Sequence, residues 1–247
     1  LYTGVQGARI DGSTPSAHTL WNDANKLKAY DIVILSCEGN EHVNGLNGQN
    51  AKTDQDRQNV KAYLEAGGRV FSSHYHYTWF KRPDSGLSTT ANWVNNVQGG
   101  NGNVAVDTTF AKGQAFRDWL VEVNASTTPG VVPMTALRRN VREVPATGAP
   151  AETSRRWLYL NEVGADHTKF FSFNTPLGKP ADEQCGRGVY TDIHVSSGDP
   201  GGGTFPTKCT STGYTPQEKA LLFLFFDLAS CIQDESKPPQ PPPPAVK

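Results

Sequence analysis

The sequence has little of what marks a membrane-spanning or nucleic-acid-binding protein. Its longest strongly apolar stretch covers only residues 220–232 and contains Asp227 and Ser230, whereas a membrane-spanning helix needs about 20 apolar residues. Lysine and arginine number 23 against 24 aspartate and glutamate residues, so the net charge is −1 and no basic surface for a polyanion is indicated. We therefore expect no membrane span and no nucleic-acid partner.

Two further signals are missing. The glycine-rich runs 99–102 and 201–203 are not followed by a helix with Lys-Ser or Lys-Thr, so they are turns rather than phosphate-binding loops. Residues 1–4 have neither the basic start nor the apolar region of an export signal. The cellular location therefore has to be inferred from other features.

The four cysteines form an even set without a C-x-x-C motif, which disfavours zinc. Cys185 and Cys209 flank the segment 196–206, which is rich in glycine and proline and has few apolar residues. A disulfide between them would close this loop, and Cys37 would then pair with Cys231 by elimination. Two disulfides indicate an oxidising compartment, so we expect a secreted or cell-surface protein. The alternative is four reduced thiols in a cytosolic protein.

The segment 237–247 is dominated by proline. Proline-rich chains adopt an extended polyproline II conformation and serve as spacers. We expect a single domain over residues 1–236, followed by a linker to other domains of the same polypeptide. Those domains are the expected protein partners.

A strand–helix–strand unit is predicted in the first third of the chain. Residues 17–30 have helical apolar spacing and lead into an apolar strand at 31–36. The motif Thr-Asp-Gln-Asp at 53–56 matches a capping box and opens a helix that the glycine pair 67–68 ends. Residues 69–73 form the next strand. Because helical crossovers return to the same sheet, the two strands should be parallel neighbours.

Less regular patterning follows. We expect an irregular insertion at about 125–165 and a long loop at 196–214. The remaining predicted elements are helices at 89–97 and 114–123, strands at 104–106, 157–160, 169–173 and 188–193, and a final helix whose capping box is Thr215-Pro-Gln-Glu218.

This order of elements resembles the class I glutamine amidotransferase-like domains of the flavodoxin type, in particular their ThuA-like branch. Residues 30–36 look like the strand before the acidic loop of that family, and residues 63–74 look like its helix and nucleophile strand. The segment 186–194 is similar to its late strand, which ends in a functional histidine. The resemblance implies an α/β fold with a mostly parallel sheet flanked by helices. The family's first strand is hard to find before Ala17.

One departure from the resembling family concerns its chemistry. A glutamine amidotransferase needs a cysteine on the tight turn after the strand at 69–73, because a thiolate on that turn attacks the amide. This chain has His74-Tyr75-His76 there, and the glycine of the turn is missing. We therefore expect no functional glutamine amidotransferase.

Polar side chains follow three of the predicted strands, and the carboxyl ends of parallel strands meet at one edge of a sheet. The candidate ligand-binding residues at this edge are His74, Tyr75, His76, Asp192 and His194. With Glu38, the imidazoles of His74, His76 and His194 offer donors for a divalent metal; alternatively, these histidines hydrogen-bond to loop backbone. The candidate catalytic residues are His74, His194, Glu38 and Cys37.

Two functions remain open at this point. The first is a non-catalytic binding or structural module of a larger secreted or cell-surface protein, with carbohydrate as the expected ligand because the resembling family is linked to sugar utilisation. The alternative is a hydrolase that works from a crevice of histidine and glutamate, with or without a metal, or with Cys37 as the nucleophile. No other cofactor is expected.

Overall fold

The predicted strand–helix–strand unit forms around a capped helix. In the computed structural model, which describes residues 1–4, 9–43, 51–94, 98–194, 213–235 and 237–238, helix α3 (Asp54–Glu65) opens with the expected capping box. Thr53 Oγ1 accepts the Asp56 backbone N–H at 3.2 Å, and the Asp56 carboxylate accepts the Thr53 N–H at 2.8 Å. The helix ends before Gly67, whose φ of 102° is readily adopted only by glycine.

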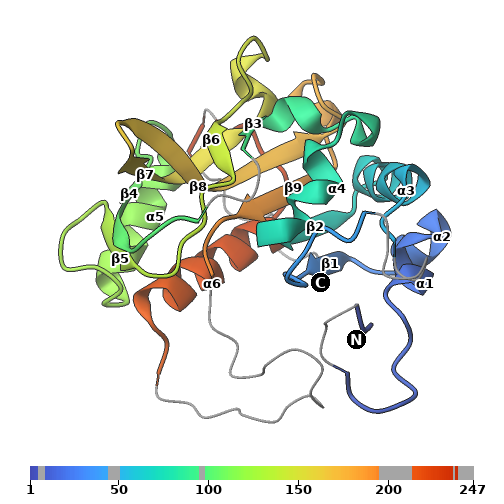
Figure 1. Ribbon diagram of the computed structural model, residues 1–247. Helices are drawn as coiled ribbons and strands as arrows, with labels where there is room; N and C mark the ends of the chain where they lie inside the picture. Colours follow the sequence, from blue (N-terminus) through green and yellow to red (C-terminus); the bar gives the residue numbers. More distant parts are fainter. Residues whose placement is uncertain (5–8, 44–50, 95–97, 195–212, 236, 239–247) are drawn as a thin grey trace, which may run out of the picture.

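The central element is a seven-stranded sheet (Figure 1), whose strand order is β1-β2-β9-β8-β7-β4-β5. The strands in this order are β1 (Ile32–Leu35), β2 (Arg69–Ser73), β9 (Gly186–Thr191), β8 (Ala165–Thr175), β7 (Arg155–Glu162), β4 (Gly102–Val106) and β5 (Val131–Met134). Strands β3 (Asn92–Trp93) and β6 (Val141–Glu143) form a separate antiparallel pair.

The parallel arrangement expected from the sequence is confined to one end of this sheet. Strand β2 runs parallel to both β1 and β9. Beyond β9 every pairing in the sheet is antiparallel, from β8 through β7 and β4 to β5. For β7 and β8 the reason is local, because these strands are joined by the short turn at Val163 and Gly164, both with positive φ, and a tight turn reverses the chain.

Helices cover both faces of the sheet, which confirms the α/β class. One face packs on α1 (His18–Trp21), α2 (Ala24–Leu27), α3 and α4 (Thr78–Lys81), and the other on α5 (Ala111–Glu122) and α6 (Pro216–Ala229). Within β2, Val70 belongs to the first apolar cluster and Phe71 to the second, because successive strand residues point to opposite faces. None of the described helices is long and apolar enough to span a membrane.

Two sequence-based predictions of secondary structure were wrong. The helix expected at 89–97 is replaced, over its described residues, by a short 3₁₀ turn and strand β3. Trp93 explains the change, because its ring packs against Phe171 and Tyr190 of the sheet at centroid distances of 5.6 and 5.1 Å. The stretch 125–165 is not an irregular insertion, since β5, β6 and β7 lie in it and β5 and β7 belong to the central sheet. The short 3₁₀ helices are η1 (His74–Tyr77), η2 (Pro83–Ser85), η3 (Ser88–Thr90), η4 (Ala151–Thr153) and η5 (Ala181–Glu183).

The final helix also decides the cysteine pairing. Helix α6 begins with the predicted capping box at the carboxyl edge, where Gln217 donates to the backbone oxygen of His194 at 2.6 Å. It ends at the opposite edge, where Arg69 donates to the Ser230 oxygen at 3.2 Å. The predicted pairing of Cys37 with Cys231 is therefore wrong, because Cys37 follows β1 at the carboxyl edge and both thiols are free.

Three other expectations fall wholly or partly outside the described residues. Cys185 is a free thiol, but its expected partner Cys209 is not among the described residues. The same holds for most of the loop at 196–214 and for most of the expected linker at 237–247.

Candidate functional site

The carboxyl edge of the parallel strands brings together residues that follow three neighbouring strands. Cys37 comes after β1, His74 after β2 and His194 after β9. The Cys37 sulfur lies 2.9 Å from Nδ1 of His74, and the rings of His74 and His194 meet edge to face with centroids 5.8 Å apart. The parallel part of the sheet thus places these three side chains next to one another.

His74 sits on a strained turn between β2 and the short helix η1. Its φ is 51°, in the left-handed region that residues with a side chain adopt at a cost of about 1 kcal/mol. The Tyr190 hydroxyl donates to the His74 backbone oxygen at 2.8 Å and so helps to hold this turn. The turn after β2 thus leads into the short 3₁₀ helix η1 and presents an imidazole at the carboxyl edge of the sheet.

The His74 imidazole is neutral at ordinary pH. Burial, together with the positive charge of Arg138 and the neighbouring His194, lowers the pKa of His74 to about 3. The side chain is only 3% exposed, and no described residue pairs with its Nε2. If the Cys37 thiol donates to Nδ1, the proton of the neutral ring is on Nε2; if Nδ1 donates to the sulfur, Nε2 is an acceptor. In both tautomers Nε2 is a buried polar atom without a partner among the described residues.

The charge of the Glu38 carboxylate is compensated by other buried side chains. Its Oε2 accepts from Lys52 Nζ at 2.6 Å and from His76 Nε2 at 2.9 Å. Burial alone would raise the pKa of Glu38, but the hydrogen bond from His76 and the charge of Lys52 outweigh it and lower the pKa to about 2. Lys52 is fully buried, with its ammonium over the rings of Trp21 and Trp79. Glu38 is therefore an ionised structural anchor, not a proton donor.

The structure does not assemble the three histidines proposed as metal ligands. His76 turns toward Glu38, whereas His74 faces Cys37 and His194. Among the described residues, no group of three or more His, Cys, Asp or Glu side chains is arranged to hold a metal ion.

Asp192 is a positioning residue. Its buried carboxylate accepts the Asn140 backbone N–H at 2.7 Å, the Asn140 side-chain amide at 2.6 Å and the Tyr190 hydroxyl at 3.0 Å. Burial raises its pKa. The carboxylate faces the loop before β6 and therefore is not presented to a ligand, contrary to the expectation from the sequence. It fixes Tyr190, which in turn holds the His74 turn.

His194 connects the buried pair to a cavity of about 660 Å³ at the same edge of the sheet. The cavity lies between the start of α6 and the ends of β4 and β5. Its polar lining consists mainly of amides and hydroxyls, with one carboxylate: Asn101, Asn103, Thr135, Thr215, Gln217 and Glu218. Met134 and Pro133 supply apolar surface. Such a lining suits a polar ligand with little charge.

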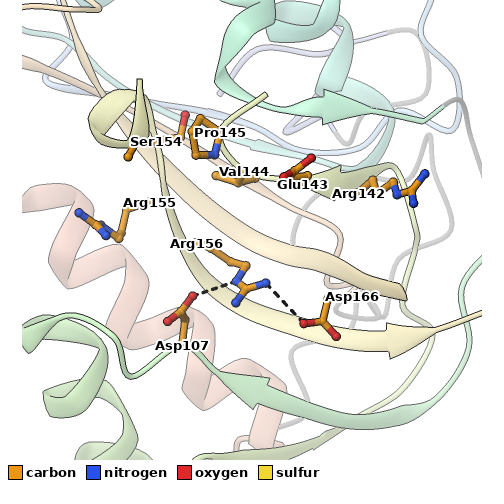
Figure 2. Close-up of a pocket in the computed structure, with 10 residues that line it drawn as sticks. Asp107, Arg142, Glu143, Val144, Pro145, Ser154, Arg155, Arg156 and Asp166 are labelled. Atoms are coloured by element: carbon orange, nitrogen blue, oxygen red, sulfur yellow. Dashed lines mark hydrogen bonds and ion pairs between the residues drawn. The ribbon is translucent and has the colours of Figure 1, made fainter. Parts of the chain in front are cut away.

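A second cavity, of about 570 Å³, lies away from these residues (Figure 2). At its centre Arg156 is paired with Asp107 at 2.8 Å and with Asp166 at 3.7 Å. Figure 2 shows the heads of Arg142 and Arg155 directed away from this central group. These ion pairs join β7 to β8 and to the residue that follows β4. Because the charged groups are paired with one another, we do not take this cavity as the candidate site.

Sequence reasoning missed three residues that shape the site. Lys52 belongs to a segment for which no element was predicted, and Arg138 lies in the stretch interpreted as irregular. Tyr190 was counted only as part of a strand. None of the three belongs to a sequence motif. Tyr190 and Arg138 both act on His74, which is more than 35 positions away in the sequence. Lys52 acts on Glu38, which is closer in the sequence. Only the fold brings them to the histidines.

Comparisons with known proteins give one distant structural likeness. No family model matches the chain, and no curated protein matches it by sequence. Among solved structures, the chain is similar to a protein from Bacteroides uniformis described as ThuA-like, with a TM-score of 0.48 and 13% identity over 88% of this chain and 78% of that chain.

Proposed function

We propose that the domain is a non-catalytic module that binds a neutral, hydroxyl-rich ligand, with carbohydrate as the ligand class. The observation that carries this proposal is the buried, neutral His74 ring, whose Nε2 has no partner among the described residues. The ring lies against His194, which lines the 660 Å³ cavity. A sugar hydroxyl can both donate and accept a hydrogen bond, so it would pair with Nε2 in either tautomer of the ring.

Aromatic side chains next to His74 support the same ligand class. The Tyr75 ring lies 4.2 Å from the His74 ring, centroid to centroid, and is partly exposed. Tyr77 is buried and donates to Glu41 at 2.6 Å, so it is a support and not a contact. A partly exposed ring beside hydrogen-bonding groups offers a stacking surface for the apolar face of a sugar.

The distance between Cys37 and His74 favours a second candidate, a hydrolase with Cys37 as nucleophile. A sulfur 2.9 Å from an imidazole nitrogen has the geometry of a thiol and its base. The electrostatics weigh against it, because a base whose pKa is about 3 takes up a thiol proton poorly near neutral pH. This is why binding is the first proposal and hydrolysis the second.

Binding is tested by a glycan array followed by calorimetric titration of the sugars retained. His74→Ala and His194→Ala should each weaken binding at least tenfold, whereas His18→Ala, a matched change of a partly exposed histidine on α1, should leave the affinity unchanged. If binding survives both changes, the ligand does not use this edge. If no sugar binds but an ester or amide is hydrolysed and Cys37→Ala abolishes the hydrolysis, the second candidate holds.

We also propose that this module belongs to a larger secreted or cell-surface polypeptide. The support is the proline-rich segment at 237–247, whose composition is typical of a spacer between domains. Fractionation of the source cells, with an antibody against the domain, tests the location directly. Recovery in the cytosolic fraction alone would refute it.

A further inference from the structure

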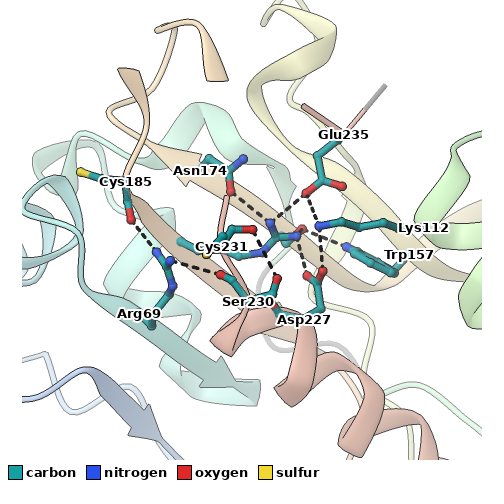
Figure 3. Close-up of polar contacts among 11 residues, drawn as sticks. Arg69, Lys112, Trp157, Asn174, Cys185, Asp227, Ser230, Cys231 and Glu235 are labelled. Carbon is teal, nitrogen blue, oxygen red and sulfur yellow. Dashed lines mark hydrogen bonds and ion pairs between the residues drawn. The ribbon is translucent and has the colours of Figure 1, made fainter. Parts of the chain in front are cut away.

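Two exposed cysteines flank one arginine at the amino edge of the sheet, far from the candidate site. Cys185 immediately precedes β9, and Cys231 follows the end of α6. The guanidinium of Arg69, at the start of β2, donates to the Cys185 backbone oxygen at 2.5 Å and to the Ser230 backbone oxygen at 3.2 Å. Figure 3 shows Cys185 on one side of Arg69 and the Ser230–Cys231 backbone on the other.

The arginine therefore fixes the two chain segments next to one another. The planar fork of a guanidinium holds its acceptors in defined directions, and here the acceptors are the carbonyl of one cysteine and the carbonyl that precedes the other. A disulfide requires Cα atoms roughly 4.4–6.8 Å apart. Residue 231 lies two positions after the end of α6, so closing the remaining distance moves this coil segment and does not require a sheet strand to move.

The surroundings favour reaction of these thiols. Burial and the nearby Arg187 lower the pKa of Arg69, whereas the Cys231 and Cys185 thiols act in the opposite direction, so both sulfurs lie within electrostatic range of this cation. The Sγ of Cys185 donates to the Glu65 backbone oxygen at 3.4 Å, a hydrogen bond that this thiol gives up when it reacts. Both side chains are exposed and so accessible to an oxidant.

We propose that Cys185 and Cys231 form a disulfide that ties the end of α6 to the start of β9. The oxidant is an external disulfide, either a small molecule such as oxidised glutathione or a protein dithiol oxidase. One thiolate attacks a sulfur of this disulfide and releases the first thiol, and the second cysteine then attacks the mixed disulfide and releases the other. The two thiol protons and two electrons of the pair end on the reduced oxidant.

This pairing differs from both pairings expected from the sequence. It joins cysteines that the fold places at one edge, whereas Cys37 lies at the opposite edge beside His74. Restricting the unfolded chain between residues 185 and 231 should raise Tm by roughly 5–15 °C, from the usual contribution of a disulfide and the thermal response of a domain of this size.

The test is a tryptic map of the full chain after incubation with oxidised glutathione, analysed without reduction. Arg187, Lys208 and Lys219 place the three cysteines 185, 209 and 231 on different peptides. We expect the peptide with Cys185 linked to the peptide with Cys231. Linkage of Cys185 to Cys209, or a Cys185 that stays free, would overturn the proposal.

Matched variants separate this bond from other oxidation. Cys231→Ser should remove both the linked peptide and the gain in Tm on oxidation, while Cys37→Ser, at the other edge, should remove neither. Arg69→Gln should slow formation of the bond at least several-fold, because the two chain segments lose the guanidinium that holds them next to one another. If the Cys231→Ser protein gains as much in Tm as the wild type on oxidation, the bond proposed here is not the one that stabilises the domain.

Discussion

The ion-pair network around Arg187 should contribute more to stability than any other polar contact described above. Arg187 on β9 is 1% exposed and lies 2.6 Å from Asp227 of α6 and 2.8 Å from Glu235. Lys112 of α5 pairs with the same two carboxylates at 3.0 and 3.3 Å. Figure 3 shows Lys112, Asp227 and Glu235 of this network directed toward one another. The network thus ties a central strand to both helices of one face.

Changing Arg187 to methionine removes one cation and leaves two carboxylates facing Lys112 alone. Removing one partner from a buried ion pair costs about 3–5 kcal/mol, because the remaining charge stays buried without compensation. For a domain of this size each kcal/mol lowers Tm by about 2–4 °C. We therefore expect Arg187→Met to lower Tm by roughly 6–20 °C.

The assay is urea unfolding followed by tryptophan fluorescence, with thermal unfolding as the second measurement. Arg117→Met is the matched control, because Arg117 forms an exposed pair with the neighbouring Asp118 and such pairs contribute about 0–1 kcal/mol. The double change Arg187→Met, Asp227→Leu should recover part of the loss, since it leaves one cation, Lys112, facing one carboxylate, Glu235. A loss for Arg187→Met no larger than that of the control would refute the reasoning.

Three further predictions follow from local contacts. The pKa of Glu38 is about 2 in the folded protein against an ordinary value of 4.5. The stabilising effect of the ionised carboxylate is therefore complete above about pH 4.5 and is lost as the pH falls toward 2. Urea unfolding across this range should show the difference in free energy of unfolding between wild type and Glu38→Gln disappear at low pH. Thr215→Ala removes the cap of α6 and should cost about 1 kcal/mol, measured the same way, with Thr19→Ala as control. An ammonia-release assay should find no glutaminase activity, and His74→Ala should not change this result; activity that disappears in Cys37→Ala would contradict it.

Local signals in the sequence account for the parts of the fold that were predicted correctly. The capping boxes at Thr53 and Thr215 define helix starts within a few residues, and Gly67 marks a helix end. These motifs work because the groups that satisfy one another are three or four positions apart. The parallel neighbours β1 and β2 then follow from the handedness of the crossover between them.

The direction of the later strands could not be predicted in the same way. A run such as Phe170 to Phe173 indicates a strand, but the apolar pattern is the same whether its neighbour runs parallel or antiparallel. Trp93 illustrates a related failure, since the helical pattern around it is overridden by contacts with β8 and β9, about 80 to 100 positions later. What decides these elements is tertiary packing, which a single sequence does not reveal.

For the candidate site, the sequence predicted which residues meet but not which of them are available to a ligand. Glu38, His76 and Asp192 each have the residue type of a functional group, yet each is saturated or turned inward by a partner that is distant in the sequence. His76 shares a lowered pKa and one buried nitrogen without a partner among the described residues, but its ring faces Glu38. His74 differs because its ring lies against His194, which lines the 660 Å³ cavity. A buried polar atom without a partner lowers stability unless a ligand pairs with it, so the ring that is a poor base is suited to recognition. That argument places binding ahead of catalysis at this edge of the sheet.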